Sequence, residues 1–247
     1  MSFRETPNKL QVVAPSFGCD TSLGDDIPAP CPSGAFFWGI FGSAGRGKTS
    51  HLLSLMTAKA PNKVYRKVFH NVFWIMPPNS RASIKGDIFE KHDPEKVFDE
   101  LNAATLQHIK ETCMAEATED YNSCLIIDDC TAALKDKSVD KLLRELAYNR
   151  RHLHLSIFIL GQSYSQMPLS VRKTLSHFSC FSPANKKEVA SIFEELIFLD
   201  KKTAEALIRH VFKKKHDFLF GNTLTGKFCR NFNEIEITGD EEPDLLS

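Results

Sequence analysis

The chain has 247 residues, of which 42% are hydrophobic, 25% are charged and 10% are aromatic. This balance is that of an ordinary globular protein, and it excludes a wholly disordered chain or a collagen-like one. The 31 basic residues equal the 31 acidic ones, and the longest apolar runs have seven residues, against the roughly 18 that a membrane span needs. We therefore expect one main domain and no membrane partner.

Three regions differ in composition. Residues 1–33 are rich in Pro, Gly, Ser and Asp and show little periodicity, so we expect a mobile or loosely packed N-terminal arm. Residues 34–238 carry the apolar pattern of a folded domain, and residues 239–247 form an acidic C-terminal tail. Because both ends are acidic and the chain is neutral, the central domain is basic.

The domain alternates short apolar runs with amphipathic stretches. The runs of strand length are 35–41, 68–76, 123–128, 155–161 and 177–181, and the stretches with helical spacing are 49–60, 95–116, 139–148, 186–197 and 200–213. Residues 217–220 and 227–237 predict a terminal hairpin or edge strands. Strands that alternate with helices predict an α/β fold with a mostly parallel central sheet.

The first strand leads into a glycine-rich loop that matches the phosphate-binding pattern G-x-x-x-x-G-K-[ST]. The residues of this candidate site are Gly42, Ser43, Ala44, Gly45, Arg46, Gly47, Lys48, Thr49 and Ser50. The helix that follows aims backbone N–H groups and its positive end at one point. Lys48 is placed to neutralise phosphate oxygens and the Thr49 hydroxyl to bind Mg²⁺. The alternative is a plain glycine turn with a surface lysine.

A later apolar strand ends in two adjacent acids, Asp128 and Asp129, and the first of them lies 80 residues after Lys48. In a parallel sheet these acids emerge at the carboxyl edge, beside the phosphate-binding loop. There Asp128 is expected to hold Mg²⁺ through water, and Asp129 to orient or deprotonate the attacking water. A helix N-cap is the alternative for the same pair.

The next strand ends at Gln162, where an amide can reach the γ-phosphate or the water. Its alternative role is that of a strand-end cap. Arg150 and Arg151 close the helix before this strand, where the helix dipole favours arginine in any case. The functional alternative is an arginine finger that acts in trans, and Arg172 is a third candidate for it.

These motifs together resemble the genome-packaging ATPases of large eukaryotic DNA viruses, virophages and related mobile elements, in the FtsK/HerA superfamily. The resemblance covers roughly residues 35–200 and rests on the phosphate-binding loop, the Asp-Asp strand and the segment from Asn149 to Phe181. It implies a three-layer P-loop NTPase fold of the ASCE/RecA type. Many members of the superfamily have Glu where this chain has Asp129, although the packaging branch commonly shows Asp-Asp.

The resemblance also implies a function. The protein it implies is a homo-oligomeric ring that hydrolyses ATP with Mg²⁺ and drives double-stranded DNA into a preformed capsid. A capsid or portal protein is the implied partner. Such a protein works where virions assemble, in the host cytoplasm or nucleus, and can be virion-associated. By position, the implied catalytic residues are Lys48, Asp129, Gln162 and Arg151. The implied metal ligands are Thr49 and Asp128.

A basic segment is our first candidate for contact with the DNA backbone. Residues 201–230 contain eight Lys and Arg residues against two acidic ones, with Lys213, Lys214 and Lys215 at the centre. Arg81 and Lys85, after the second strand, are the second candidate. Contacts to the backbone without base readout are expected, since packaging accepts any sequence. A solvated surface is the alternative for both.

Two other functions stay open. A small-molecule or nucleotide kinase uses the same loop, but it needs an arginine-rich lid, and no clear lid motif is found. A nucleotide-gated scaffold would bind ATP without turnover and recruit capsid proteins through the acidic ends.

Overall fold

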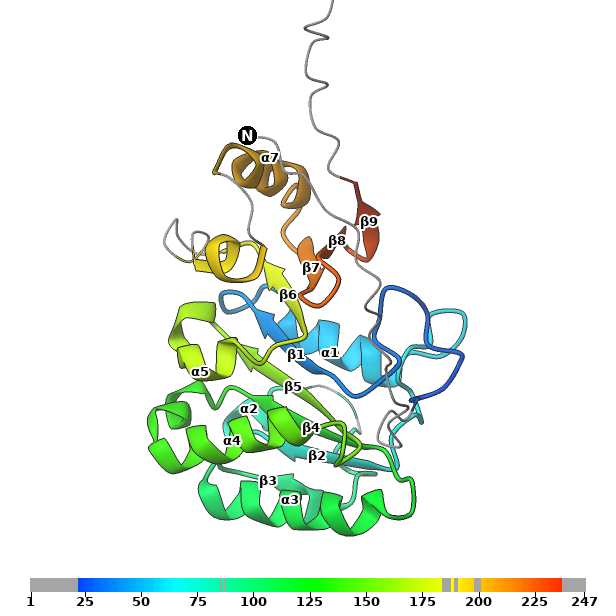
Figure 1. Cartoon of the computed structure of the whole chain (residues 1–247). Coiled ribbons are helices and arrows are strands. Elements are labelled where there is room, and N and C mark those ends of the chain that lie inside the picture. Colours follow the sequence, from blue (N-terminus) through cyan, green and yellow to red (C-terminus); the bar gives the residue numbers. More distant parts are fainter. Residues whose placement is uncertain are drawn as a thin grey trace, which may run out of the picture.

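The computed structural model describes residues 22–84, 86, 88–183, 188, 191–197 and 201–236. Within them, one nine-stranded sheet has the order β3-β2-β4-β5-β1-β6-β7-β8-β9 (Figure 1). Its strands are β1 (Phe37–Phe41), β2 (Asn71–Ile75), β3 (Val97–Phe98), β4 (Ser123–Asp128), β5 (Leu155–Gly161), β6 (His177–Phe181), β7 (Phe218–Asn222), β8 (Lys227–Arg230) and β9 (Asn233–Ile235). Pairing is parallel from β3 to β6 and antiparallel from β6 to β9. The predicted α/β fold with a mostly parallel sheet is confirmed.

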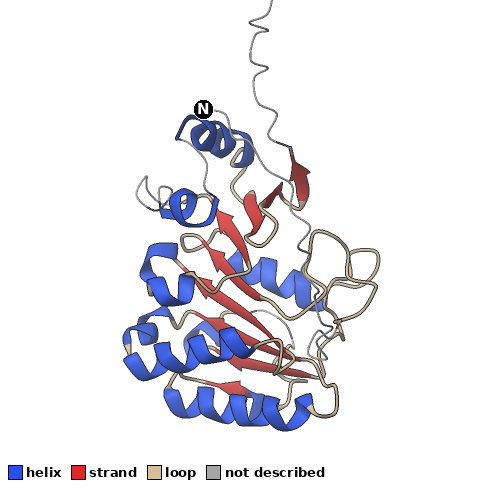
Figure 2. Ribbon diagram, in the orientation of Figure 1, coloured by secondary structure: helices blue, strands red, loops and turns tan. Residues whose placement is uncertain are grey.

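Helices cover both faces of the sheet and make three layers (Figure 2). One face carries α1 (Lys48–Thr57), and the other carries α3 (Ala103–Ala117), α4 (Lys137–Asn149) and α5 (Leu169–Arg172). The remaining helical elements are α2 (Pro78–Ala82), η1 (Pro94–Lys96), η2 (Thr131–Lys135), η3 (Tyr164–Gln166), η4 (Phe193–Ile197) and α7 (Lys201–Val211). Four of these, α2, η1, η2 and η3, are single short turns in the connections between strands.

Two hydrophobic clusters, one on each face, hold the sheet in place. Alternate side chains of a strand point to opposite faces. In β1, Phe37 and Phe41 join the cluster with α3 and α4, whereas Trp38 and Ile40 join the cluster with α1. All four are at most 1% exposed, and the burial of each large apolar side chain contributes about 1.5–3 kcal/mol. The carboxyl edge of the sheet is therefore a rigid platform.

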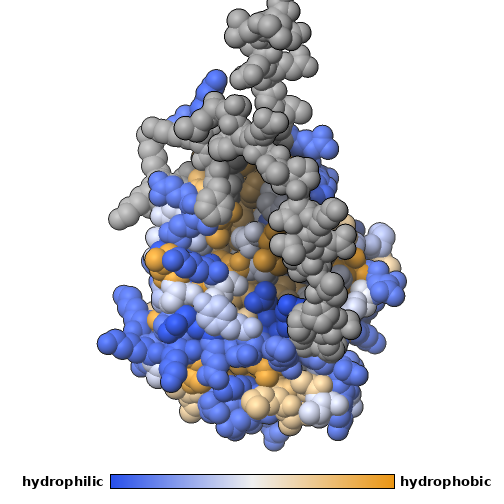
Figure 3. All heavy atoms as spheres, viewed as in Figure 1, coloured by the Kyte–Doolittle hydropathy of each residue, from blue (hydrophilic) through white to orange (hydrophobic). Residues whose placement is uncertain are grey.

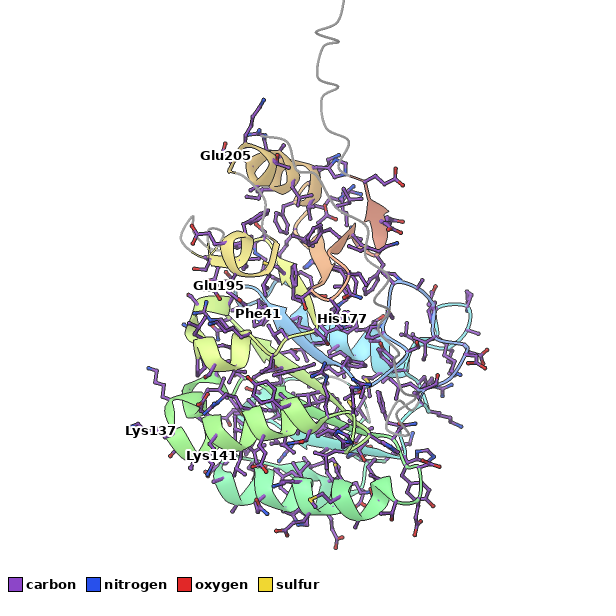
Figure 4. The ribbon with its side chains drawn as sticks, viewed as in Figure 1. Phe41, Lys137, Lys141, His177, Glu195 and Glu205 are labelled. Carbon is purple, nitrogen blue, oxygen red and sulfur yellow. The ribbon has the colours of Figure 1, made fainter. Side chains whose placement is uncertain are left out.

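The helix α4 shows how the sequence sets one of these outer layers. The side chain of Asp136 caps it by accepting the backbone N–H groups of Ser138 and Val139. Lys137 and Lys141 point away from the sheet (Figure 4), and hydrophilic residues cover the region of α4 in the space-filling view (Figure 3). Among the described residues, none of the helices combines the length and apolar character needed to cross a bilayer.

One predicted helix begins later in the structure. The predicted helix over 95–116 begins only at Ala103, because Val97 and Phe98 pair with β2 and the Asn102 side chain accepts the N–H of Thr105 as an N-cap. The predicted terminal hairpin or edge strands are confirmed, since β7 and β8 pair antiparallel at one edge of the sheet, but the stretch 227–237 is divided in two. It contains β8 and β9, since the chain turns at 231 and 232, where both residues have positive φ values of 51° and 69°.

Part of the predicted N-terminal arm contacts the domain. Leu23 is 7% exposed and belongs to the cluster on the α1 face. Its N–H donates to the Ser33 carbonyl at 2.6 Å, and the Tyr65 hydroxyl donates to the Pro32 carbonyl at 2.9 Å. Residues 1–21 and the acidic tail 239–247 lie outside the described residues.

Candidate active site

The loop after β1 needs glycine at two positions. Gly42 has a φ of 153°, and a Cβ there would lie 2.7 Å from the Cβ of Phe181. Its N–H donates to the carbonyl oxygen of Gly161 at 3.2 Å, which joins the loop to the end of β5. Gly47 has a φ of 103° directly before α1. Both values lie in a region that L side chains rarely adopt.

Lys48 folds back over this loop. Its Nζ donates to the carbonyl oxygens of Gly42 at 2.7 Å and Ser43 at 3.3 Å. Burial lowers the pKa of Lys48, while the charges of Asp128 and Asp129 raise it. The ammonium group therefore lies where phosphate oxygens can replace the two carbonyls as acceptors.

Thr49 and Asp128 form the candidate metal site. The Thr49 hydroxyl donates to Oδ2 of Asp128 at 2.9 Å, and Asp128 is 5% exposed. Burial raises the pKa of Asp128, and the hydrogen bond from Thr49 lowers it. A hydroxyl and a carboxylate fit Mg²⁺, which takes one or two protein oxygens and completes its shell with phosphate and water. No cluster of three or more His, Cys, Asp or Glu that would hold a metal by itself occurs among the described residues.

Asp129 lies beside Asp128 but faces a different neighbour. It is exposed, has a φ of 58°, and its Oδ2 accepts a hydrogen bond from the Ser80 hydroxyl at 2.7 Å. The following η2 is capped by Cys130 without a side-chain hydrogen bond. The alternative in which one of the two acids is a helix N-cap is therefore not supported.

One cleft of about 590 Å³ brings these groups together. It is lined by Ala44, Gly45, Lys48, Thr49, Ser50, Leu53, Ser80, Ser83, Ile84, Asp128, Asp129, Leu160, Gly161 and Gln162. The loop, the Asp-Asp pair and Gln162 thus meet as the motifs predict. Sequence reasoning missed the wall formed by Ser80, Ser83 and Ile84. A signal for it was the Pro-Pro-Asn-Ser turn directly after a strand.

The three candidate arginines lie outside this cleft. Arg150 donates to the carbonyl of Ala147 at 2.8 Å at the end of α4. This contact is the helix-end role that was the alternative to an arginine finger. Arg172 pairs with Glu195 at 2.7 Å and stacks on the Tyr164 ring, 4.8 Å from its centroid. Arg151 is exposed and precedes β5, whose seven residues span about 23 Å up to Gln162.

Lysines 213–215 occupy an exposed turn between α7 and β7. The turn is held by the buried carboxylate of Asp217, which accepts the backbone N–H groups of Lys213 at 3.0 Å and Lys214 at 2.8 Å. Asp217 also accepts from Arg230 at 2.9 Å and Asn231 at 2.7 Å. These hydrogen bonds, that of Asn231 first, hold the pKa of Asp217 well below its usual range.

The basic turn lies against the phosphate-binding loop. The Nδ1 atom of His216 is 3.1 Å from the carbonyl oxygen of Arg46. A Cβ at Gly47 would lie 3.4 Å from the same nitrogen. The exposed lysines and the nucleotide cleft are therefore neighbours, although the sequence separates them by about 170 positions.

A phosphate-binding loop and an Asp-Asp strand that converge at the carboxyl edge of a mostly parallel sheet define a P-loop NTPase. Residues 33–217 match the model of the family described as Poxvirus A32 protein. The chain belongs to this family, and the resemblance to viral packaging ATPases is confirmed.

Two curated relatives agree with this assignment. The DNA packaging protein OPG160 of Vaccinia virus (strain Copenhagen) is 30% identical over 151 residues, which is 58% of this chain and 52% of the relative. The protein of the same name from Monkeypox virus is 29% identical over 150 residues, 58% of this chain and 46% of the relative. The chain spans about half the length of these relatives.

Solved structures share the fold. B204, the DNA-packaging ATPase from Sulfolobus turreted icosahedral virus, has a TM-score of 0.55 at 14% identity, over 82% of this chain and 98% of its own. The cytoplasmic domain of the type VII secretion ATPase EccC from Thermomonospora curvata has a TM-score of 0.52 at 16% identity, over 82% of this chain and 24% of its own. The predicted P-loop ATPase fold is thereby confirmed.

Proposed function

We propose that this protein is a motor subunit that hydrolyses ATP and translocates double-stranded DNA into a preformed capsid. The observation that carries the proposal is the Thr49–Asp128 hydrogen bond, because it joins the phosphate-binding loop to the Asp-Asp strand inside one cleft, in a chain of the A32 family. The relatives named DNA packaging protein support DNA as the molecule that this motor moves.

Five of the residues that line the cleft, and one arginine outside it, have roles in this proposal. The loop N–H groups and Lys48 bind the phosphates, and Thr49 with Asp128 holds Mg²⁺, which neutralises charge that develops on the transferred phosphoryl group. Asp129 orients or deprotonates the attacking water, and Gln162 contacts the γ-phosphate or that water. Arg151 completes the site of a neighbouring subunit.

The DNA contact is assigned to the turn of lysines 213–215, which is exposed and lies beside the nucleotide loop. Arg81 is the second candidate; it pairs with Asp99 at 2.8 Å. Lys85, the other residue of this second candidate, lies outside the described residues. A homo-oligomeric ring, a capsid or portal partner and a place at the virion assembly site complete the proposal.

The kinase alternative has less support. A P-loop kinase closes basic residues over its acceptor, yet the described residues that line the cleft include Lys48 from the loop and no arginine. The lining residues that follow β2 are Ser80, Ser83 and Ile84, none of them basic.

ATP turnover of the purified protein, measured with and without double-stranded DNA, tests the proposal. We expect turnover to rise with DNA and to vanish in Lys48→Ala and Asp128→Ala, while Lys137→Ala on the surface of α4 behaves as wild type. Phosphate transfer to a small acceptor instead of water would establish the kinase. Tight ATP binding without turnover, even with DNA, would favour the scaffold.

A further inference from the structure

We propose that Glu188 is a positioning residue that directs the side chain of Gln162 into the nucleotide cleft. The inference rests on the proposed function, because it concerns the geometry of hydrolysis. It links a helical residue that follows β6 to a group at the end of β5.

Glu188 holds the three residues that follow Gln162. Its Oε2 atom accepts hydrogen bonds from the hydroxyls of Ser163 at 2.5 Å and Ser165 at 2.9 Å. Its Oε1 atom accepts the backbone N–H of Tyr164. Three consecutive residues therefore share one carboxylate as their acceptor.

The chemistry of a carboxylate fits this arrangement. Glu188 is 6% exposed, and a buried carboxylate is unfavourable unless hydrogen bonds replace those of the lost water. Hydrogen bonds to an ionised acceptor are roughly twice as strong as neutral ones. An amide at this position would offer one acceptor oxygen instead of two. The carboxylate therefore fixes the turn in a way that an uncharged side chain of the same size does not.

Gln162 lies between two residues that are held in place. Gly161 ends β5, and its carbonyl accepts the N–H of Gly42 from the phosphate-binding loop at 3.2 Å. Ser163, on the other side, is bound by Glu188. Gln162 itself is exposed and lines the cleft. The sheet on one side and Glu188 on the other therefore set the direction of its side chain.

A second carboxylate holds the ring of the same turn. Glu195, on η4 (Figure 4), accepts hydrogen bonds from the Tyr164 hydroxyl at 2.9 Å and from Arg172 at 2.7 Å. Glu188 binds the backbone next to Gln162, whereas Glu195 binds the tip of the tyrosine. Neither carboxylate lines the nucleotide cleft, so each acts on a bound nucleotide only through other residues.

The test is the substitution Glu188→Gln, which keeps the size of the side chain and removes one acceptor oxygen. We expect kcat for ATP to fall about tenfold, because a small displacement of a group at the reacting atoms costs that much or more. KM for ATP should stay unchanged, since Glu188 does not line the cleft. Asp136→Asn is the matched control with an unchanged kcat. Asp136 also accepts a serine hydroxyl and backbone N–H groups, but it caps α4 outside the cleft.

A double-mutant cycle with Gln162→Ala separates positioning from a general structural role. If Glu188 acts through Gln162, Glu188→Gln lowers kcat in the wild-type background and has no further effect in the Gln162→Ala background. Ser163→Ala removes only the bond next to Gln162 and is the milder second variant, for use where Glu188→Gln does not fold. Its effect on kcat should depend on Gln162 in the same way.

Two results would overturn the inference. One is a wild-type kcat in both Glu188→Gln and Ser163→Ala, and the other is a fall in kcat that stays the same size in the Gln162→Ala background. If wild type hydrolyses no ATP, the proposed function fails instead. Hydrogen exchange then tests the contact without turnover, because the Tyr164 amide should exchange faster in Glu188→Gln than in wild type. Equal exchange rates would overturn the inference as well.

Discussion

The hydroxyl of Thr49 donates a 2.9 Å hydrogen bond to the carboxylate of Asp128, 79 positions further along the chain. It joins the first turn of α1 to the end of β4, although β5 lies between β1 and β4 in the sheet. The packed strands hold both oxygens at the carboxyl edge, where they would serve as the protein's ligands for Mg²⁺.

Thr49→Ala is expected to weaken the use of Mg²⁺ more than the binding of the nucleotide. The loop N–H groups and Lys48 stay in place, but one of the two protein oxygens for the metal is lost. We expect the Mg²⁺ concentration for half-maximal ATP turnover to rise by about tenfold or more. Thr49→Ser keeps the oxygen and serves as the control. A Mg²⁺ titration with the same midpoint in Thr49→Ala as in wild type would contradict this assignment.

Motifs that carry their own local geometry were predictable from sequence. The strands over 123–128, 155–161 and 177–181 agree with β4, β5 and β6 to the residue, because each is a buried run bounded by polar residues. The phosphate-binding loop likewise implies a strand before it and a helix after it. Since the carboxyl ends of parallel strands lie at the same edge of a sheet, the two motifs together also predicted that Lys48 and Asp128 lie close to each other.

Contacts that depend on strand order were not predictable. The bond from Ser80 to Asp129 requires β2 to lie next to β4, and no local pattern encodes that pairing. The contact of His216 with Arg46 similarly requires β7 to add antiparallel to β6. The predicted helix over 95–116 began too early because apolar residues at 97, 98 and 101 fit both a helix and an edge strand.

Asp217→Asn is expected to destabilise the fold at neutral pH and less so in acid. The carboxylate is buried and binds Arg230 and Asn231, so its pKa is lower in the folded chain than in the unfolded one. The stabilisation is therefore fully present above about pH 4 and is lost as the pH falls further.

We expect a loss of about 2–4 kcal/mol at pH 7 in the free energy of unfolding, measured by urea denaturation. The difference between the variant and wild type should shrink as the pH falls from 5 toward 2. Asp120→Asn, in an exposed turn, is the control. If the difference in unfolding free energy between Asp217→Asn and wild type increases as the pH falls, the predicted pH dependence is wrong.

The lysine turn is expected to set the salt dependence of DNA binding. Each phosphate contact contributes about 0.9 to the slope of log K against log salt concentration, so replacement of lysines 213–215 by Ala lowers it by up to about 2.7. The effect should be the same for DNA of any sequence. The control is the double variant Lys137→Ala with Lys141→Ala, whose exposed lysines lie on α4 (Figure 4). An unchanged slope in the variant of lysines 213–215 would show that the DNA contact lies elsewhere, and Arg81 would be the next candidate.

Arg151 lies too far from its own cleft to act there, so the trans role proposed for it needs a neighbouring subunit. It precedes β5, and Gln162 follows it, so the length of the strand, about 23 Å, separates Arg151 from its own cleft. Arg151→Ala is expected to lower ATP turnover of the assembled protein by about 10³-fold or more, the contribution of a trans arginine in other phosphoryl-transfer enzymes. Because each subunit would lend its arginine to the next, mixtures of Arg151→Ala with Lys48→Ala subunits should regain turnover that neither variant has alone. Arg144→Ala, which removes an arginine paired with Asp140 on α4, should leave turnover unchanged. Mixtures that stay inactive, or an Arg151→Ala assembly that turns over like wild type, would rule out the trans role.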